Sequence, residues 1–367
     1  MKNKAVIAFL FVLTTLCSAQ NNIADSSNLI DPRLNETQNQ FLNNQAEALL
    51  SQANEVFSQY PPSWPEPLAR RSAFLLLDGV LHDVYAPQRP PVQSFLKTRL
   101  KKAADEIERV QITKGAQIWK LYNHSFVIRT KSVTLGFDLL SRKAAGADGF
   151  SIATDDMSRI IDQCDALFIS HRHGDHAEEW VAQRFIDQGK PVVAPPEVWK
   201  DKPIYASITH LNREPHTVQS LSIQGGDKEL SVVIYPGHQG DKIENNVSLV
   251  ITPEGLSFSH MGDQFNENDF QWIDEVSNNH LVDVLMPNCW TRDIVRVATG
   301  FNPALIITGH ENEMGHTIDH REPYWLTYQR RKGSERFGGR EGVGYETPLI
   351  PMAWGESYFY QRENFSK

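Results

Sequence analysis

Helical spacing of apolar residues marks the first part of the chain. Over residues 37–60 the apolar side chains recur at the period of a helix with one buried face. They are Leu42, Ala46, Leu49, Ala53, Val56 and Tyr60. Thr37 and Gln40 have the spacing of a capping box, so we expect the helix to begin there. The prolines from Pro61 onward should end it, because proline cannot continue a helix.

Two further helices are predicted before residue 112. One spans residues 67–85. The next follows Pro90-Pro91, and its apolar face would carry Leu96, Leu100, Ala103, Ile107 and Val110. We interpret residues 20–112 as a helical extension. Because nothing in it has the composition of a flexible linker, we expect its apolar stripes to pack on the main domain.

The pattern changes at Gly115, after which short apolar runs typical of strands alternate with helices. The expected strands are residues 117–122, 126–130, 133–139, 165–170, 190–194, 230–235, 247–252, 256–259, 282–286 and 304–308. The expected helices are residues 177–188, 268–278 and 292–299. This mixture predicts an α+β domain over residues 113–367.

Composition fits a globular protein rather than a disordered one. Of the 367 residues 40% are hydrophobic and 22% are charged, and the formal net charge is −9. A chain of this length can bury a sizeable core without disulfide bonds. The negative charge argues against nucleic acid or an anionic membrane as a partner.

The first residues have the layout of a secretory signal peptide. Lys2 and Lys4 precede an apolar run over residues 5–16, and Cys17-Ser18-Ala19 offers a cleavage site of small residues. Because Leu16 stands where a lipoprotein signal has a small residue, we expect cleavage after Ala19 or Gln20 rather than a lipid anchor. The mature protein would then be periplasmic or secreted, and no apolar run is long enough to span a membrane.

Two cysteines, Cys164 and Cys289, remain beyond that segment. An oxidising compartment would permit one disulfide, but two separate buried thiols are the simpler interpretation. A thiolate metal site is not expected with so few sulfur atoms.

A dense group of metal-capable side chains follows the expected strand at residues 165–170. The sequence there is His171-Arg172-His173-Gly174-Asp175-His176. Residues two apart in an extended turn point the same way, so His171 and His173 can bind one cation together. Asp175 and His176, which we expect to begin the next helix, can turn toward a second cation.

Three further candidates stand just past other expected strands. They are His238 in Tyr235-Pro236-Gly237-His238, Asp263 in His260-Met261-Gly262-Asp263, and His310 in Thr308-Gly309-His310. Ligands on several elements are what would hold two metals rigidly.

With these residues the chain resembles the metallo-β-lactamase-fold superfamily of metallohydrolases. The specific motif is H-x-H-x-D-H, followed in chain order by His, Asp and His. The resemblance covers residues 115–367 and implies a four-layer αββα sandwich with the metals at one edge. It assigns the first metal to His171, His173 and His238, the second metal to Asp175, His176 and His310, and a bridging role to Asp263.

Residues 121–139, with Asn123-His124-Ser125 and Phe137-Asp138, are most similar to the lactonase and phosphodiesterase branch of that superfamily. The common zinc β-lactamases place a cysteine on the second metal, and this chain has none available there. Nitrogen and oxygen ligands suit zinc, although manganese, iron and nickel stay open.

The resemblance implies a hydrolase that uses a hydroxide bridging two divalent cations, with Asp175 and Asp263 as catalytic carboxylates. The expected substrate is a small anionic or lipid-like ester, lactone or phosphodiester. Nuclease or β-lactamase activity, or a non-catalytic metal-binding role on the same fold, are the alternatives. The oligomeric state stays open.

Candidate substrate-binding residues follow His310. His316 could line the pocket or be a plain loop histidine, and both His316 and His320 could compete with His310 as a ligand. His260 could support a metal ligand indirectly, although a strand histidine with its own hydrogen bonds is the simpler interpretation. His124 could approach the site from an early strand end. The simpler interpretation of the glycine-rich segment at residues 328–341 is a solvated, mobile loop, but it could instead fold over the metal edge. Its arginines would then hold a phosphate or carboxylate of the substrate, and they are Arg330, Arg331, Arg336 and Arg340.

Overall fold

The computed structural model describes residues 29–141 and 149–365. The predicted signal peptide and its Cys17 lie outside these residues. In the described part of the chain, no helix is both long and apolar enough to cross a membrane.

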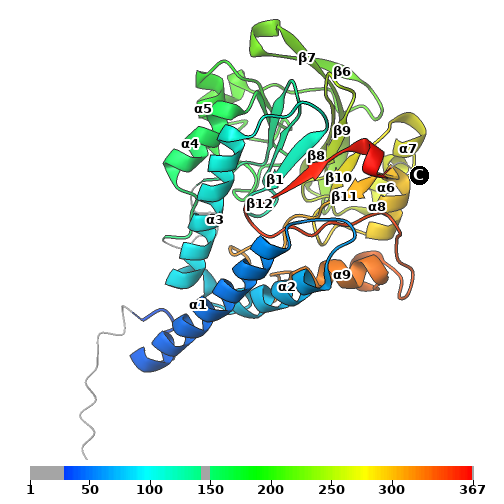
Figure 1. Ribbon diagram of the computed structural model, residues 1–367. Helices are drawn as coiled ribbons and strands as arrows, with labels where there is room; N and C mark the ends of the chain where they lie inside the picture. The colour runs from blue at the N-terminus through cyan, green and yellow to red at the C-terminus, as the bar shows by residue number, and fades with distance from the viewer. Residues whose placement is uncertain (1–28, 142–148, 366–367) are drawn as a thin grey trace, which may run out of the picture.

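Two mixed six-stranded sheets form the centre of the molecule (Figure 1). The first has the order β12-β1-β2-β3-β4-β5. Its strands are β1 (Ala116–Lys120), β2 (Phe126–Arg129), β3 (Thr134–Phe137), β4 (Ala166–Phe168), β5 (Val192–Val193) and β12 (Glu356–Tyr360). The strands from β12 to β3 pair antiparallel, whereas β3, β4 and β5 pair in parallel.

The second sheet has the order β11-β10-β9-β8-β7-β6. Its strands are β6 (Gln219–Ile223), β7 (Lys228–Gln239), β8 (Ile243–Ile251), β9 (Ser257–His260), β10 (Val284–Met286) and β11 (Leu305–Ile306). The long hairpin of β7 and β8 pairs Ser231 with Ile251 at one end and Gln239 with Ile243 at the other. Strands β4, β9 and β11 lead into the loops that carry most of the candidate ligands, whereas His238 lies within β7.

Apolar side chains from both sheets meet between them in one buried layer, which includes Ile118, Phe137, Val232 and Phe258. The outer face of the first sheet is covered by α3 (Pro90–Arg109), α4 (Thr154–Gln163) and α5 (Glu179–Asp187). The outer face of the second sheet is covered by α6 (Phe270–Ile273), α7 (Val276–Asn279) and α8 (Ile294–Phe301). The predicted α+β, four-layer αββα sandwich is therefore confirmed.

The N-terminal helices form where their apolar periodicity predicts them. They are α1 (Glu36–Gln59), α2 (Leu68–Leu81) and α3. The capping box lies two residues before the expected one: Asn35 accepts from Gln38 N, and the Gln38 side chain accepts from Asn35 N. Asparagine is as good an N-cap residue as threonine. The helix therefore begins at the earlier of the two possible capping boxes.

These helices share one buried cluster with the first sheet. Phe57 of α1, Leu77 of α2 and Leu96 of α3 lie in the same apolar cluster as Trp119 of β1. Buried Arg70 of α2 also donates two hydrogen bonds to Glu356 of β12, at 2.9 and 2.7 Å. The division of the chain into domains at residue 112 stays a prediction, since α3 itself supplies part of the outer helical layer.

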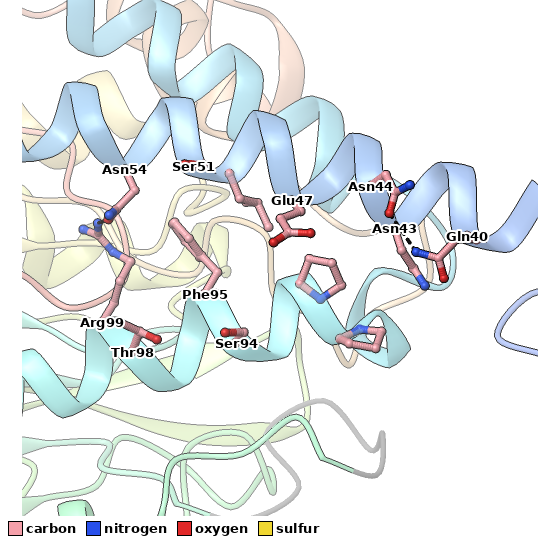
Figure 2. A pocket seen from close by; sticks show the side chains of 13 residues that line it. Gln40, Asn43, Asn44, Glu47, Ser51, Asn54, Ser94, Phe95, Thr98 and Arg99 are labelled. Atoms are coloured by element: carbon pink, nitrogen blue, oxygen red, sulfur yellow. Dashed lines mark hydrogen bonds between the residues drawn. The ribbon is translucent and has the colours of Figure 1, made fainter.

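A groove of about 520 Å³ lies between α1 and α3 (Figure 2). Its walls are mainly polar side chains, among them Gln40, Asn43 and Glu47 from α1 and Ser94 from α3. No candidate metal ligand lines it.

Some elements differ from the expected ones. The helix expected at residues 268–278 is broken at Asp274 and Glu275 into α6 and α7. Helix α4, strands β6 and β12, and helix α9 (Tyr324–Lys332) were not expected. Each is short and has few buried apolar residues, so local periodicity gives a weak signal. Cys164 and Cys289 are free and buried, as the simpler interpretation predicts.

Candidate metal centre

The H-x-H-x-D-H motif forms a tight turn after β4. The backbone N–H groups of His176 and Ala177 both donate to the carbonyl of His173, at 3.0 and 2.8 Å. Helix α5 begins only at Glu179, so the expectation that Asp175 and His176 start the helix is wrong. The turn lets both residues point to the same edge of the sandwich as His171.

Asp263 and His310 reach this turn from the second sheet. Asp263 follows β9 and His310 follows β11, and both side chains are buried. His310 has a φ of 72°, and its N–H donates to the carbonyl of Asn123 at 3.0 Å. The two loops therefore bring their side chains against the motif from the opposite sheet.

The candidate ligands form two adjoining groups around Asp263. In the more enclosed group, ligand atoms of Asp175, His176, Asp263 and His310 converge. Nε2 of His176 lies 3.3 Å from Oδ2 of Asp175 and 3.3 Å from Oδ2 of Asp263. Nε2 of His310 lies 3.4 Å from Oδ2 of Asp175 and 3.3 Å from Oδ1 of Asp263. The two imidazole nitrogens also face each other at 3.3 Å. Two imidazoles and two carboxylates aimed at one point are the donor set of a divalent cation.

His171, His173 and Asp263 form the second group. Nε2 of His171 is 3.5 Å from Oδ2 of Asp263. It is buried and makes no hydrogen bond within the described chain. Burial lowers the pKa of His171 to about 3, so its ring is neutral and its nitrogen lone pair is available to a metal. Asp263 belongs to both groups, which is what a bridging ligand requires.

The structure does not bring the seventh predicted ligand, His238, to either group among the residues it describes. His238 is the penultimate residue of β7, and its Nδ1 lies 2.8 Å from Oδ1 of buried Asp269. Its neighbour Gln239 approaches the metal groups instead, and donates from Nε2 to Oδ2 of Asp263 at 3.0 Å. Oε1 of Gln239 is buried without a hydrogen bond in the described chain.

Asp138 supports the motif from β3 and was not predicted as a site residue. It is fully buried, has a φ of 44°, and places Oδ2 2.7 Å from Nδ1 of His176. Ser170 donates to Asp138 from its backbone N–H at 2.7 Å and from its hydroxyl at 2.6 Å. Burial opposes the charge, yet the neighbouring His260 and His176 hold the pKa of Asp138 below its usual range. A carboxylate on the far nitrogen orients a metal-binding imidazole.

Substitution of Asp138 by asparagine should therefore weaken metal binding by about 10–100-fold. Asp269→Asn is a matched control, because Asp269 holds a histidine outside both groups. Competition with a chromophoric chelator measures each affinity. Equal losses in the two variants would contradict the assignment of Asp138 to the metal centre.

Carboxylates decide the protonation of the enclosed group in the metal-free protein. Burial disfavours a charged imidazole, but Asp263 and Asp175 outweigh it and raise the pKa of His310 to about 10. The pKa of His176 is raised for the same reason, whereas the histidines hold the pKa values of Asp175 and Asp263 well below their usual range. A cation bound there would replace these protons.

The loop that carries His310 is fixed by α2, β1 and α9. Glu311 is fully buried, forms an ion pair with Lys120 of β1 and accepts from the hydroxyl of Thr327 of α9 at 3.0 Å. Asp78 of α2 accepts from Nδ2 of Asn312 at 2.8 Å. Asp78 also accepts from two N–H groups at the start of α9. The helical extension thus anchors a loop of the metal centre.

Other histidines lie near the cluster. The ring of His316 stacks on that of His310 at 5.4 Å, and the backbone N–H of His316 donates to buried Glu313 at 2.6 Å. His124, His260 and Asp138 form a third buried group beneath the motif. Burial lowers the pKa of both His124 and His260, and each ring contacts a backbone carbonyl. Both histidines thus have backbone partners, and the ring of His124 lies 6.2 Å from that of His176 and 6.3 Å from that of His310. His320 is exposed and pairs with Asp319.

The arginines after His310 make contacts within the protein. Arg330 of α9 is buried, and its two terminal nitrogens donate to the carbonyls of Cys289 and Thr291. Arg336 pairs with Glu322, and the guanidinium of Arg331 lies 4.7 Å from the centre of the Trp64 ring. Arg340 is exposed and forms a backbone bridge with Val343. The guanidinium groups of Arg330 and Arg336 also lie 5.3 and 4.8 Å from the centre of the Phe337 ring.

Aromatic rings also come from the loops beside the cluster. Trp290 packs edge-on against His310 at 5.4 Å, and Phe265 packs on Trp290 at 5.8 Å. Phe337, from the segment expected to cover the metals, packs on Phe265 at 5.8 Å. All three rings are half-buried. That segment therefore reaches toward the metal edge with a phenylalanine.

Neither a protein-family model nor a curated protein matches the chain. Solved structures give matches at low identity. One is a metallo hydrolase from Ignicoccus hospitalis, with 14% identity and a TM-score of 0.46 over 68% of this chain and 100% of that one. An isothiocyanate hydrolase from Delia radicum gut bacteria has 12% identity and a TM-score of 0.48 over 67% and 99%. A diiron beta-hydroxylase from Streptomyces venezuelae has 14% identity and a TM-score of 0.42 over 57% and 49%.

The arrangement of sheets and helices in the chain itself defines its fold. Two facing six-stranded sheets carry helices on both outer faces. The motif turn lies at the end of β4, where Asp263 and His310 meet it from the second sheet. This architecture is that of the metallo-β-lactamase fold.

Proposed function

We propose that the protein is a metal-dependent hydrolase with a dinuclear centre. One observation carries the proposal: buried Asp263 is shared by two adjoining groups of ligand atoms. Asp175, His176 and His310 would hold one cation, and His171 and His173 the other, with Asp263 between them. Zinc suits these nitrogen and oxygen donors, and other divalent metals stay open.

Bound metals at such a site supply a hydroxide nucleophile at neutral pH and polarise the bond under attack. Asp175 is the half-exposed carboxylate of the cluster. Its Oδ2 accepts from Nδ2 of Asn123 at 3.2 Å, which fixes its direction. We assign Asp175 to orient the attacking water and to take up its proton. Asp138 and Ser170 would keep His176 in position throughout.

Gln239 completes the first metal site in our proposal, in place of His238. Its Oε1 needs a partner, and a rotation of the amide would turn that oxygen toward the position between His171, His173 and Asp263. An amide oxygen is an acceptable ligand for a divalent cation.

Gln239→Ala should accordingly weaken the first of two metal sites, while His238→Ala should leave it intact. Cobalt(II) titration followed by visible absorption reports occupancy and coordination without relying on turnover. Loss of the first cobalt in His238→Ala, with normal filling of Gln239→Ala, would overturn the assignment.

The proposed substrate is a small ester, lactone or phosphodiester with a lipid-like part. The half-buried rings of Phe265, Trp290 and Phe337 support an apolar group beside the scissile bond. An anionic group on the substrate was expected from the loop arginines. It has less support, since Arg330 and Arg336 are engaged within the protein.

The function is tested by assaying purified protein against esters, lactones and phosphodiesters that carry short or long alkyl groups. Activity should disappear in strong chelator and return with zinc or manganese. Turnover of nucleic acid or a β-lactam alone would favour those alternatives. No turnover by a fully metal-loaded protein would favour a non-catalytic metal-binding role.

Export is proposed from the sequence of the first residues. Cleavage after Ala19 would remove two lysines and change the net charge from −9 to −11. N-terminal sequencing of the native mature protein should begin near Gln20. A mature protein that still begins at Met1 would contradict cleavage.

A further inference from the structure

Helices α2 and α9 pack side by side (Figure 1). Residues of both helices line a cleft. One part, of about 190 Å³, is lined by Arg71, Leu75, Trp325, Tyr328, Gln329 and Lys332. The other part, of about 630 Å³, extends toward residues 342–346. The two parts share Arg71, Tyr328 and Lys332, so they adjoin, and together we call them the α2–α9 cleft. None of the candidate metal ligands lines it.

The smaller part of the cleft is apolar. Leu75 is 51% exposed and Trp325 is 48% exposed. Tyr328 lines both parts and is held in place, because its hydroxyl donates to Glu66 at 2.6 Å and the guanidinium of Arg71 lies 5.1 Å from the centre of its ring. Large exposed apolar side chains next to a fixed aromatic ring offer area that a ligand tail can cover.

The larger part of the cleft is cationic, although the chain as a whole carries a net charge of −9. Arg71, Arg331 and Lys332 line it, against one carboxylate, Glu346. Arg71 is paired with Glu66 at 3.0 Å, but the contact of Arg331 with Trp64 leaves its charge uncompensated. Lys332 makes no ion pair within the described residues. The cleft thus places positive charge next to an apolar groove.

We propose that the α2–α9 cleft binds a single-chain anionic amphiphile, of the class of alkyl carboxylates. The tail lies against Leu75, Trp325 and Tyr328, and the headgroup meets Arg331 and Lys332. The site is separate from the metal centre and does not depend on its catalytic role.

Chain length and headgroup charge test the proposal with full-length protein. Octanoate, decanoate and dodecanoate, each below its micelle concentration, are titrated by calorimetry. Each added methylene should tighten binding by about threefold to fourfold until the groove is filled. Decyltrimethylammonium should bind at least about tenfold more weakly than decanoate, because its charge is opposite. The proposal would be overturned if the three carboxylates bound with equal affinity, or if decyltrimethylammonium bound as tightly as decanoate.

Substitutions of two exposed residues test whether the amphiphile binds in the α2–α9 cleft. Trp325→Ala should remove the tail-length dependence, and Lys332→Glu should weaken decanoate about tenfold. Phe41→Ala and Lys97→Glu are the matched controls, since both residues are exposed on other helices. Decanoate binding that is equal in all four variants, or binding only to anionic phospholipid vesicles, would also overturn the proposal. Metal content, measured in each variant, should stay unchanged.

Discussion

Replacing Lys120 by methionine should lower the free energy of unfolding by about 3–5 kcal/mol. Lys120 and Glu311 are both fully buried and form an ion pair. Burial opposes ionisation of Glu311, but Lys120 outweighs it and keeps the pKa of Glu311 below its usual range. Without Lys120 an uncompensated carboxylate remains inside the protein. Urea unfolding followed by circular dichroism measures the effect.

The double variant Lys120→Met, Glu311→Gln should recover much of that stability, because it leaves no buried charge. Arg159→Ala is a control for ion pairs that are more exposed: Arg159 pairs with Asp105 and Glu108, and its loss should cost less than about 1 kcal/mol. A Lys120→Met protein as stable as the parent would show that the pair is not needed to hold the His310 loop.

Asp263→Ala should lower kcat/KM by at least about 10³-fold, because one carboxylate serves both proposed metals. Metal content should fall below that of the parent protein, while the far-ultraviolet circular dichroism stays the same. Gln239 loses its acceptor in this variant as well. The measurement is a set of kinetic constants paired with elemental analysis of the same sample.

Asp269→Asn is a suitable control for Asp263→Ala, since Asp269 is buried but contacts His238 and Gln264. Its activity should stay within a few fold of the parent. Full turnover by metal-loaded Asp263→Ala would exclude Asp263 as the bridging ligand.

The candidate ligands on the motif could be predicted because their geometry is local. His171 to His176 form one turn after one strand, and the spacing alone indicates that the side chains gather. Asp263 and His310 could be predicted because each directly follows an apolar strand. Parallel strands of one sheet end at a common edge, so such residues meet.

The same reasoning does not predict which of His238 and Gln239 faces the metal groups. Strand β7 continues to Gln239, four residues beyond the expected end at residue 235. Neighbouring residues of a strand point to opposite faces. The direction of each side chain therefore depends on where the pairing with β8 ends, and hydropathy does not determine that.

Asp138 and Arg330 could not be assigned from the sequence because their partners are distant. Asp138 meets His176, which is 38 residues away. Arg330 donates to carbonyls on the loop after β10. A charged residue in a glycine-rich segment looks solvent-exposed until the tertiary fold supplies its partners.

The dinuclear centre is tested most directly by counting metal in the purified full-length protein. After growth in zinc-replete medium and removal of loosely bound ions, elemental analysis should give about two divalent cations per chain. Anomalous diffraction should place them beside Asp263, one toward His171 and one toward His310. A protein that binds no divalent metal after reconstitution, or whose metal lies away from Asp263, would contradict the account.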